Sequence, residues 1–241
     1  MVYYDAQSST SFTESFHVHS FATLIIHIHR ITMSTEGSIS SVVAPVRCLL
    51  NGNGRIGRLV LRYSWSDPLI DVIQINDLCA CASAAYLIKY DSVHGTWDKD
   101  VQCIDDNTIS IDGKLIKFTQ EKVITDIPNL DQIELVMECT GKFLTTTALQ
   151  PYLDAGVKQV VVSAPVKEAS VLNVVLGCNH TKFVDQPIIT NASCTTNCLA
   201  PIVKVMLENF GIKHGCITTI HVRTFVLFSK CEYIVLVSIR Y

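Results

Sequence analysis

Residues 51–58 read Asn-Gly-Asn-Gly-Arg-Ile-Gly-Arg, and this short stretch decides the fold of the 241-residue chain. Gly52, Gly54 and Gly57 form the pattern G-x-G-x-x-G between an apolar run at 46–50 and helix-forming residues at 58–63. The first two glycines of such a pattern permit a tight turn and close approach of a pyrophosphate, and the third lets the helix pack on the strand. The helix N-terminus then faces the phosphates. We therefore expect a strand–turn–helix unit that binds a dinucleotide.

An acidic residue follows at the spacing that this unit requires. Asp77 closes the apolar run at 70–75 and lies 20 residues after Gly57. A carboxylate at this place binds the ribose 2′-hydroxyl and repels a 2′-phosphate, so NAD is favoured over NADP as the cofactor. The alternative is a glycine turn followed by a strand-ending Asp with no ligand between them.

Strands and helices alternate through the middle of the chain. Apolar runs at 46–50, 70–75, 135–139 and 160–162 predict strands, and the stretches 80–89 and 145–154 predict helices between them. This alternation is typical of an α/β fold with a doubly wound, mostly parallel sheet of the Rossmann type. We expect this domain to span residues 46–193.

The first 45 residues have a different character. Ser and Thr cluster at 8–13 and 34–41 without helical periodicity, which predicts a loosely ordered extension over residues 1–45. Two His-x-His pairs, His17/His19 and His27/His29, lie in it. They could bind a metal, but no carboxylate or thiol lies nearby in sequence, so we expect no metal site.

Composition excludes several classes of protein. The chain is 49% hydrophobic and 17% charged with a formal net charge of −3, which argues against disorder and against partners such as nucleic acid or an anionic membrane. No apolar stretch is long enough to predict a membrane span, and no basic leader precedes the apolar residues near the N-terminus. Ten scattered cysteines indicate a reducing, cytoplasmic environment rather than a disulfide framework or a zinc site.

A candidate nucleophile lies in the second half of the chain. Cys194 falls at the predicted start of a helix that continues through 199–210 to Gly211. Backbone N–H groups and the helix dipole at such a position favour a thiolate. His221 ends a β-rich run and could act as its base, because a Cys and a His far apart in sequence can meet in a fold. A buried structural cysteine is the alternative.

Several segments together resemble one enzyme family. They read NGNGRIGR at 51–58, IND at 75–77, YDSVHG at 90–95, ECTG at 138–141, SAP at 163–165 and SCTTNCLAP at 193–201. In this order, over about residues 46–221, the chain resembles glyceraldehyde-3-phosphate dehydrogenase. The resemblance implies an NAD-dependent oxidoreductase of carbohydrate metabolism that converts glyceraldehyde 3-phosphate, with phosphate, through a cysteine thioester. It also implies a homotetramer.

The resemblance assigns roles to residues of this chain. Cys194 is implied as the nucleophile and His221 as the residue that raises its reactivity. Ser193 and Thr195 fall on positions that hold substrate or phosphate. The cofactor contacts that the resemblance and the glycine pattern imply are Gly52, Gly54, Arg55, Ile56, Gly57, Asp77, Lys122 and Ser163.

The chain departs from the family pattern in two places. Leu49 and Asn53 stand where the family usually has Gly and Phe. After His221 the resemblance is lost, so we expect residues 194–221 to begin an incomplete second domain and residues 222–241 to form an unrelated apolar tail. We accordingly expect impaired activity and a reduced tetramer interface, with a non-catalytic NAD-binding or interaction fragment as the alternative function.

Overall fold

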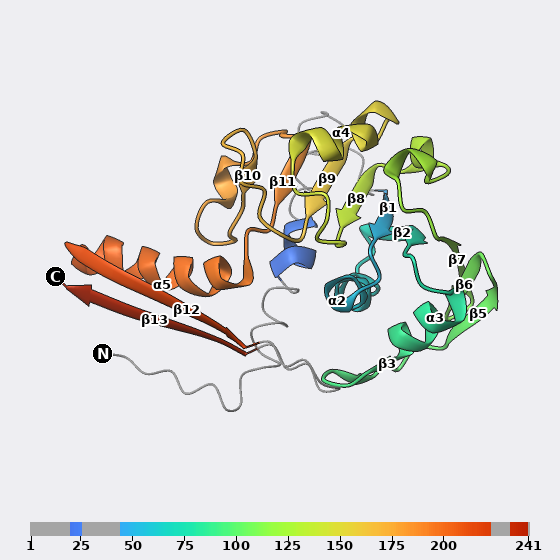
Figure 1. The fold of residues 1–241 in the computed structure, drawn as a ribbon, viewed down its shortest axis with the longest axis horizontal. Helices are drawn as coiled ribbons and strands as arrows, with labels where there is room; N and C mark the ends of the chain where they lie inside the picture. Colours follow the sequence, from blue (N-terminus) through green and yellow to red (C-terminus); the bar gives the residue numbers. More distant parts are fainter. Residues whose placement is uncertain (1–19, 26–43, 223–231, 241) are drawn as a thin grey trace.

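The structure is a computed structural model that describes residues 20–25, 44–222 and 232–240, with side chains described as far as residue 218 (Figure 1). Within these ranges, the strands of the largest sheet follow the order β10-β11-β9-β8-β1-β2-β7-β6-β5. Their bounds are β1 Val46–Asn51, β2 Ile70–Asn76, β5 Val101–Asp105, β6 Thr108–Ile111, β7 Lys114–Thr119, β8 Leu135–Glu138, β9 Gln159–Val162, β10 Leu172–Asn173 and β11 Ile188–Thr190.

The sheet is parallel from β10 to β7, and only β6 and β5 pair antiparallel at its edge. The six strands β7, β2, β1, β8, β9 and β11 have the 3-2-1-4-5-6 order of a doubly wound dinucleotide-binding sheet. The predicted fold class is therefore confirmed. The order reverses between β1 and β8, and ligands of such sheets bind outside the carboxyl ends of the strands at that point.

Helices cover both faces of the sheet. The bounds of the helices are α2 Arg55–Ser64, α3 Cys81–Lys89, α4 Thr146–Asp154 and α5 Cys194–Phe210, with short 3-10 turns at Ile124–Asp126, Leu130–Gln132 and His180–Lys182. Side chains of α2 and α3 belong to one buried cluster, and side chains of α4 belong to the other. Successive residues of β1 divide between them, because Cys48 and Leu50 lie in the first cluster and Leu49 in the second. Leu49 is therefore a core residue with no exposed surface.

The described part of the N-terminal region differs from the prediction. Residues 20–25 are helical, and Phe21, Leu24 and Ile25 have no exposed surface and belong to the same core cluster as α2 and α3. A loosely ordered extension is wrong for these six residues. The four histidines of the His-x-His pairs lie outside the described residues.

The last described elements are α5 and a two-stranded antiparallel hairpin. β12 His214–Val222 pairs along its length with β13 Glu232–Arg240, and β13 contacts α5. Figure 1 shows this hairpin beside α5, at one end of the large sheet. Gly211 ends α5 with a φ of 74°, as its sequence position predicts. A smaller hairpin joins β3 Tyr90–Asp91 to β4 Gly95–Thr96. Among the described residues, none of the helices is long and apolar enough to cross a membrane.

Candidate active site

The glycine turn between β1 and α2 is packed too tightly for larger residues at two positions. Gly52 has a φ of +96°, and a Cβ built there would lie 2.7 Å from the backbone nitrogen of Thr140. A Cβ on Gly57 would lie 1.9 Å from the carbonyl oxygen of Gly52. The strand, the turn and the helix therefore meet backbone to backbone, as the sequence pattern predicts.

The N-terminus of α2 is open to a ligand. Gly54 is the N-cap, no side chain caps the helix, and no acidic residue occupies its first turn. A Cβ built on Gly54 would meet no protein atom within 4 Å. Arg55 and Ile56, the first residues of the helix, are both half-buried. The backbone N–H groups of the first turn and the free space above Gly54 fit the pyrophosphate of a dinucleotide.

Asp77 lies at the carboxyl end of β2, beside the glycine turn. Its Oδ2 accepts a hydrogen bond from the backbone N–H of Asn53 at 2.6 Å, and its Oδ1 accepts one from the backbone N–H of Cys79 at 3.0 Å. Each carboxylate oxygen has a second lone pair, so the half-buried Asp77 can still accept hydrogen bonds from ribose hydroxyls.

A cleft of about 330 Å³ opens at these strand ends, and we call it the strand-end cleft. Of the predicted cofactor residues, Gly52, Asp77 and Lys122 line it together. Ser163 lies farther along, just after β9, where its N–H donates to the carbonyl of Glu138 at 2.9 Å. The full lining is Asn51, Gly52, Asn76, Asp77, Leu78, Glu121, Lys122, Ile124, Ile127, Thr140, Lys142 and Phe143.

Sequence reasoning missed a row of buried polar side chains beneath this cleft. Glu138, Asn51, Asn76 and Thr119 are the last residues of β8, β1, β2 and β7, which are adjacent in the sheet. Asn51 Nδ2 donates to Glu138 Oε2 at 2.8 Å, Asn76 Nδ2 donates to Asn51 Oδ1 at 2.8 Å, and Thr119 Oγ1 donates to Asn76 Oδ1 at 2.8 Å. Side-chain hydrogen bonds thus join four strand ends in one row. The available signal was that each of these strands ends in a polar residue.

Glu138 anchors this row and the loop after it. Its Oε2 also accepts the hydroxyl of Tyr152 at 2.9 Å, and its Oε1 accepts both the backbone N–H and the hydroxyl of Thr140. Burial raises the pKa of the Glu138 carboxyl, although the donors from Thr140, Asn51 and Tyr152 oppose the shift. The same burial, together with the neighbouring Glu138, raises the pKa of Tyr152. Glu138 therefore fixes Thr140, whose amide lies against Gly52.

The side chain of Asn53, in the glycine turn, is buried and only partly hydrogen-bonded. The residue is 2% exposed, and its Nδ2 donates to the carbonyl of Ala84 at 3.4 Å. Its Oδ1 has no hydrogen-bond partner among the described residues. A buried amide oxygen without a partner costs stability, so this departure from the family pattern weakens the local packing.

Cys194 is the first residue of α5, as the sequence predicts. Ser193 caps the helix, and its Oγ accepts the N–H of Thr196 at 3.1 Å and lies 3.0 Å from Oγ1 of Thr195. Ser193, Cys194 and Thr195 are all half-buried. The three predicted substrate and nucleophile residues therefore meet at one helix N-terminus, whose dipole stabilises a thiolate.

The turn before Cys194 is held by buried side chains. Ala192 has a left-handed conformation with a φ of 54°, and its N–H donates to Thr190 Oγ1 at 2.9 Å. Asn197, which is 1% exposed, reaches back from the first turn of α5. Its Nδ2 donates to the carbonyl of Asn191 at 2.6 Å and to that of Ser193 at 3.0 Å. Asn197 thus clamps the turn that carries Cys194.

Five of the other described cysteines have raised thiol pKa values, which make them weaker nucleophiles than an ordinary thiol. Burial raises the pKa of Cys79 to about 11 and that of Cys81 to about 12, and it also raises the pKa values of Cys48, Cys139 and Cys198. Cys198, one turn after Cys194 on α5, is half-buried.

The backbone of His221 lies near the C-terminal end of β12, opposite Tyr233 of β13, and its side chain lies outside the described part of the structure. β12 follows α5 through a tight connection and runs back along it (Figure 1). The end of β12 that carries His221 and the start of α5 that carries Cys194 therefore lie at the same end of this pair. The pairing of the two side chains stays a prediction.

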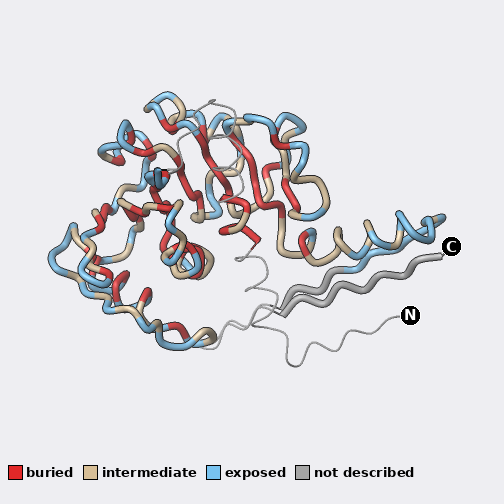
Figure 2. Tube along the Cα trace, turned by 180° about the vertical axis from the view of Figure 1, so that it is seen from behind, coloured by how far each residue is buried: buried red, intermediate tan, exposed pale blue. Residues whose placement is uncertain are grey.

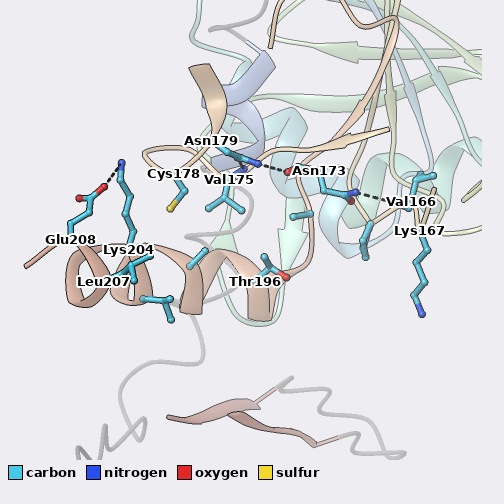
Figure 3. Close-up of a pocket in the computed structure, with 14 residues that line it drawn as sticks. Val166, Lys167, Asn173, Val175, Cys178, Asn179, Thr196, Lys204, Leu207 and Glu208 are labelled. Carbon is cyan, nitrogen blue, oxygen red and sulfur yellow. Dashed lines mark hydrogen bonds and ion pairs between the residues drawn. The ribbon is translucent and has the colours of Figure 1, made fainter. Parts of the chain in front are cut away.

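A second cleft, of about 600 Å³, lies between α5 and the loop 165–179 (Figure 3). Thr196 opens onto it, and Lys204 reaches across it to donate to the carbonyl of Gly177 at 2.7 Å. Neither Cys194 nor any predicted cofactor residue lines it. Ala192 of the nucleophile turn lines it, so this cleft reaches the turn without including Cys194.

Comparison with known proteins agrees with this geometry. Residues 46–146 match the family model described as glyceraldehyde 3-phosphate dehydrogenase, NAD binding domain, and residues 193–225 match the corresponding C-terminal domain. The second match continues past His221, so the family pattern extends slightly farther than the sequence motifs indicate. The two matches together cover more than half of the chain.

Curated relatives give the same result. Glyceraldehyde-3-phosphate dehydrogenase 3 of Nostoc sp. is 46% identical over 183 residues, which are 74% of this chain and 54% of the relative. The enzyme of Eremothecium gossypii is 44% identical over 73% of this chain and 53% of the relative, and the cytosolic enzyme of Leishmania mexicana is 44% identical over 74% and 54%. The chain spans about half the length of the curated relatives it matches. It belongs to the glyceraldehyde-3-phosphate dehydrogenase family.

Proposed function

We propose that this chain carries out the NAD-dependent oxidation of glyceraldehyde 3-phosphate through a thioester on Cys194, with phosphate as the second substrate. One observation carries the proposal. The same fold holds an open glycine turn with Asp77 beside it and, after β11, the third strand beyond the switch point, a cysteine at a capped helix N-terminus. A cofactor site and a thiolate site on one sheet edge are the two parts that this reaction needs.

The cofactor half of the proposal assigns binding roles to described residues. The N–H groups at the start of α2, which includes Arg55 and Ile56, would hold the pyrophosphate, and Asp77 would hold the adenosine ribose. Lys122, on the exposed rim of the strand-end cleft, would add a positive charge beside the nucleotide. Ser163, at the end of β9, would contact the part of the cofactor nearest to the nucleophile.

The chemical half begins with the thiol. The dipole of α5 stabilises the Cys194 thiolate, and His221 would take the thiol proton. The thiolate sulfur attacks the aldehyde carbon, a C–S bond forms, and the carbonyl electron pair moves to oxygen. His221 returns its proton to that oxygen, which gives a thiohemiacetal. Backbone N–H groups at the start of α5 would stabilise the developing oxyanion.

Oxidation and release follow from the thiohemiacetal. Bound NAD supplies the hydride acceptor. As the hydride leaves carbon, His221 removes the hydroxyl proton and the carbon attached to Cys194 becomes a thioester carbonyl. A phosphate oxygen then attacks this carbonyl, the C–S bond breaks, and the Cys194 thiolate leaves with its electron pair. Ser193 and Thr195 would hold substrate or phosphate beside the sulfur.

The proposal also covers partners, assembly and location. The named substrates are small molecules, and nucleic acid and membrane are not expected partners. The resemblance implies a homotetramer, of which this chain has a reduced interface, and the cytosolic relative supports a cytoplasmic location. We propose residues 46–193 as the cofactor domain, residues 194–221 as the start of the catalytic domain and residues 222–241 as a tail. The second candidate is an NAD-binding or interaction module without catalysis. The exposed apolar side chains along α5 favour it, because they form a surface that a partner could cover.

A single-turnover experiment separates these two functions. The full chain is mixed with NAD and glyceraldehyde 3-phosphate without phosphate, and both NADH absorbance and the mass of the Cys194 peptide are followed. We expect NADH and an acyl adduct on Cys194 in equal amounts, and neither product with C194S. NAD binding without any adduct on Cys194 would favour the non-catalytic module.

A further inference from the structure

Residues 20–25 form a buried contact with the nucleophile turn that lies more than 170 residues away along the chain. Phe21, Leu24 and Ile25 have no exposed surface, and Ser20 is 5% exposed. Figure 1 shows this short helical segment in blue between the large sheet and the start of α5, and Figure 2 shows it as buried. The segment therefore belongs to the folded domain rather than to a tail attached to it.

The apolar residues of the segment complete one face of the sheet. They belong to the same buried cluster as Met137 of β8 and Val161 of β9, which also have no exposed surface. Val136 of β8 and Val160 and Val162 of β9 belong to the opposite cluster, which also contains the buried side chains of α4. Residues 21–25 thus pack on the face of the sheet opposite α4. The burial of their apolar side chains fixes the position of Ser20.

Ser20 reaches the clamp of the nucleophile turn. Its Oγ lies 3.2 Å from Oδ1 of Asn191 and 3.1 Å from Oδ1 of Asn197, and all three residues are buried. Asn197 donates to the carbonyls of Asn191 and Ser193, on either side of the left-handed Ala192. The Ser20 hydroxyl has one hydrogen, which the two amide oxygens share as acceptors. Because its Oδ1 faces this hydroxyl, the Asn197 side chain is held in the orientation that points its Nδ2 at the turn.

We propose that Ser20 is a positioning residue for Cys194, acting through Asn197. This inference rests on the proposed function, because it assigns Ser20 to the activation of the same nucleophile. The hydroxyl holds Asn197, Asn197 holds the carbonyls of Asn191 and Ser193, and the turn then presents the Cys194 sulfur at the N-terminus of α5. Without the hydroxyl, the Asn197 side chain loses one of the contacts that hold its orientation, and the turn loses part of what keeps Ala192 left-handed.

Three full-length variants and a control test the proposal. S20A removes the hydroxyl, and S20T keeps it. F21L weakens the packing of the same segment without touching the hydrogen bonds. S83A is the matched control, because Ser83 is exposed on α3. Each protein is compared by the rate at which limiting iodoacetamide labels Cys194, by hydrogen exchange of the peptide 191–198, and by its thermal midpoint.

We expect S20A to slow Cys194 labelling about threefold to tenfold, the loss expected for one hydrogen bond of about 1 kcal/mol, and to speed exchange in the peptide 191–198. S20T and S83A should behave like the unmodified chain. F21L should lower the thermal midpoint but leave labelling and exchange unchanged. The proposal is overturned if S20A leaves both readouts unchanged, or if F21L alters them as much as S20A does at an equal loss of thermal midpoint.

The exchange readout also separates this proposal from the proposed function. If Cys194 of the unmodified chain labels no faster than the half-buried Cys103, the catalytic proposal is contradicted. Even then, faster hydrogen exchange of the peptide 191–198 in S20A, but not in the other variants, would support the positioning role of Ser20. Unchanged exchange of this peptide in S20A would overturn it.

Discussion

The carboxylate of Asp77 accepts a hydrogen bond from the backbone N–H of Asn53, with 2.6 Å between Oδ2 and nitrogen. This contact joins the end of β2 to the glycine turn, so the side chain that we propose to bind the adenosine ribose also shapes the turn. The position of Asp77 thus depends on the turn, and the shape of the turn depends on Asp77.

The first prediction concerns cofactor choice. D77A removes the carboxylate that would bind the 2′-hydroxyl and repel a 2′-phosphate. We expect the preference for NAD over NADP to fall by about 1–3 kcal/mol, or about fivefold to 150-fold in the ratio of dissociation constants. Titration of both nucleotides into the full-length variant measures this ratio. D98A changes an exposed carboxylate and serves as the control. Equal or tighter NADP binding by the unmodified chain would refute the assignment of Asp77.

Two glycines of the turn should respond differently to the same substitution. A Cβ on Gly57 would overlap the carbonyl oxygen of Gly52, whereas a Cβ on Gly54 would meet no protein atom. We expect G57A to lower the free energy of unfolding by about 1–3 kcal/mol or more. G54A should unfold like the unmodified chain but bind NAD at least tenfold more weakly, because its methyl group fills the space of the pyrophosphate. Urea unfolding and NAD titration of both variants test this contrast. Full NAD affinity in G54A would mean that the ligand does not approach there.

The strand–turn–helix unit could be predicted because its signals are local. Glycines at fixed spacing, an apolar run before them and Asp77 after them all act within about thirty residues. The N-terminus of α5 was predictable for the same reason, since Ser193 and Gly211 mark its ends. The polar row was not, because Glu138, Asn51, Asn76 and Thr119 become neighbours only through the order of the strands. The burial of residues 20–25 could not be predicted either, because six residues are too few to show a helical period. Their apolar side chains pack in a core whose other members lie far along the chain.

A pH dependence follows from Glu138. Burial raises its pKa above the ordinary value of 4.5, so the folded protein binds this proton more readily than the unfolded chain. The carboxyl therefore costs stability above its folded pKa, and this cost is relieved as the pH falls toward 4.5. We expect the unmodified chain to gain stability relative to E138Q as the pH is lowered over this range. Chemical unfolding of both proteins at several pH values measures the difference.

Glu134 provides a control of opposite sign. It lies just before the same strand, and although partial burial raises its pKa, hydrogen bonds from Arg47 outweigh this and the pKa is lowered. Its contribution to stability is present above the ordinary pKa and is lost as the pH falls. The unmodified chain should therefore lose stability relative to E134Q at low pH. The same trend for E138Q and E134Q would contradict the assignment for Glu138.

Thiol reactivity is the next prediction. Cys194 should react with iodoacetamide at neutral pH faster than Cys198 or Cys216, because it begins α5 and its thiolate is stabilised by the helix dipole. Cys198 lies one turn farther along the same helix, and burial raises its pKa. Labelling followed by peptide mass spectrometry ranks the cysteines in one experiment. H221A should slow labelling of Cys194 alone, and an unchanged rate would mean that His221 does not act on this thiol.

The last prediction concerns the outer surface of α5. Ile202, Val205 and Phe210 each have more than half of their surface exposed, and Ile217 of β12 is 54% exposed. Apolar side chains gathered in this way favour association, because contact removes them from water. We expect the full chain to elute from a sizing column as a broad, concentration-dependent peak. The double variant V205E/F210K should narrow that peak without lowering the thermal midpoint, since neither side chain is buried. The control Y86K changes one exposed aromatic residue on α3, 62% exposed, and should leave the elution unchanged. A narrow monomer peak from the unmodified chain at every concentration would show that this surface does not drive association.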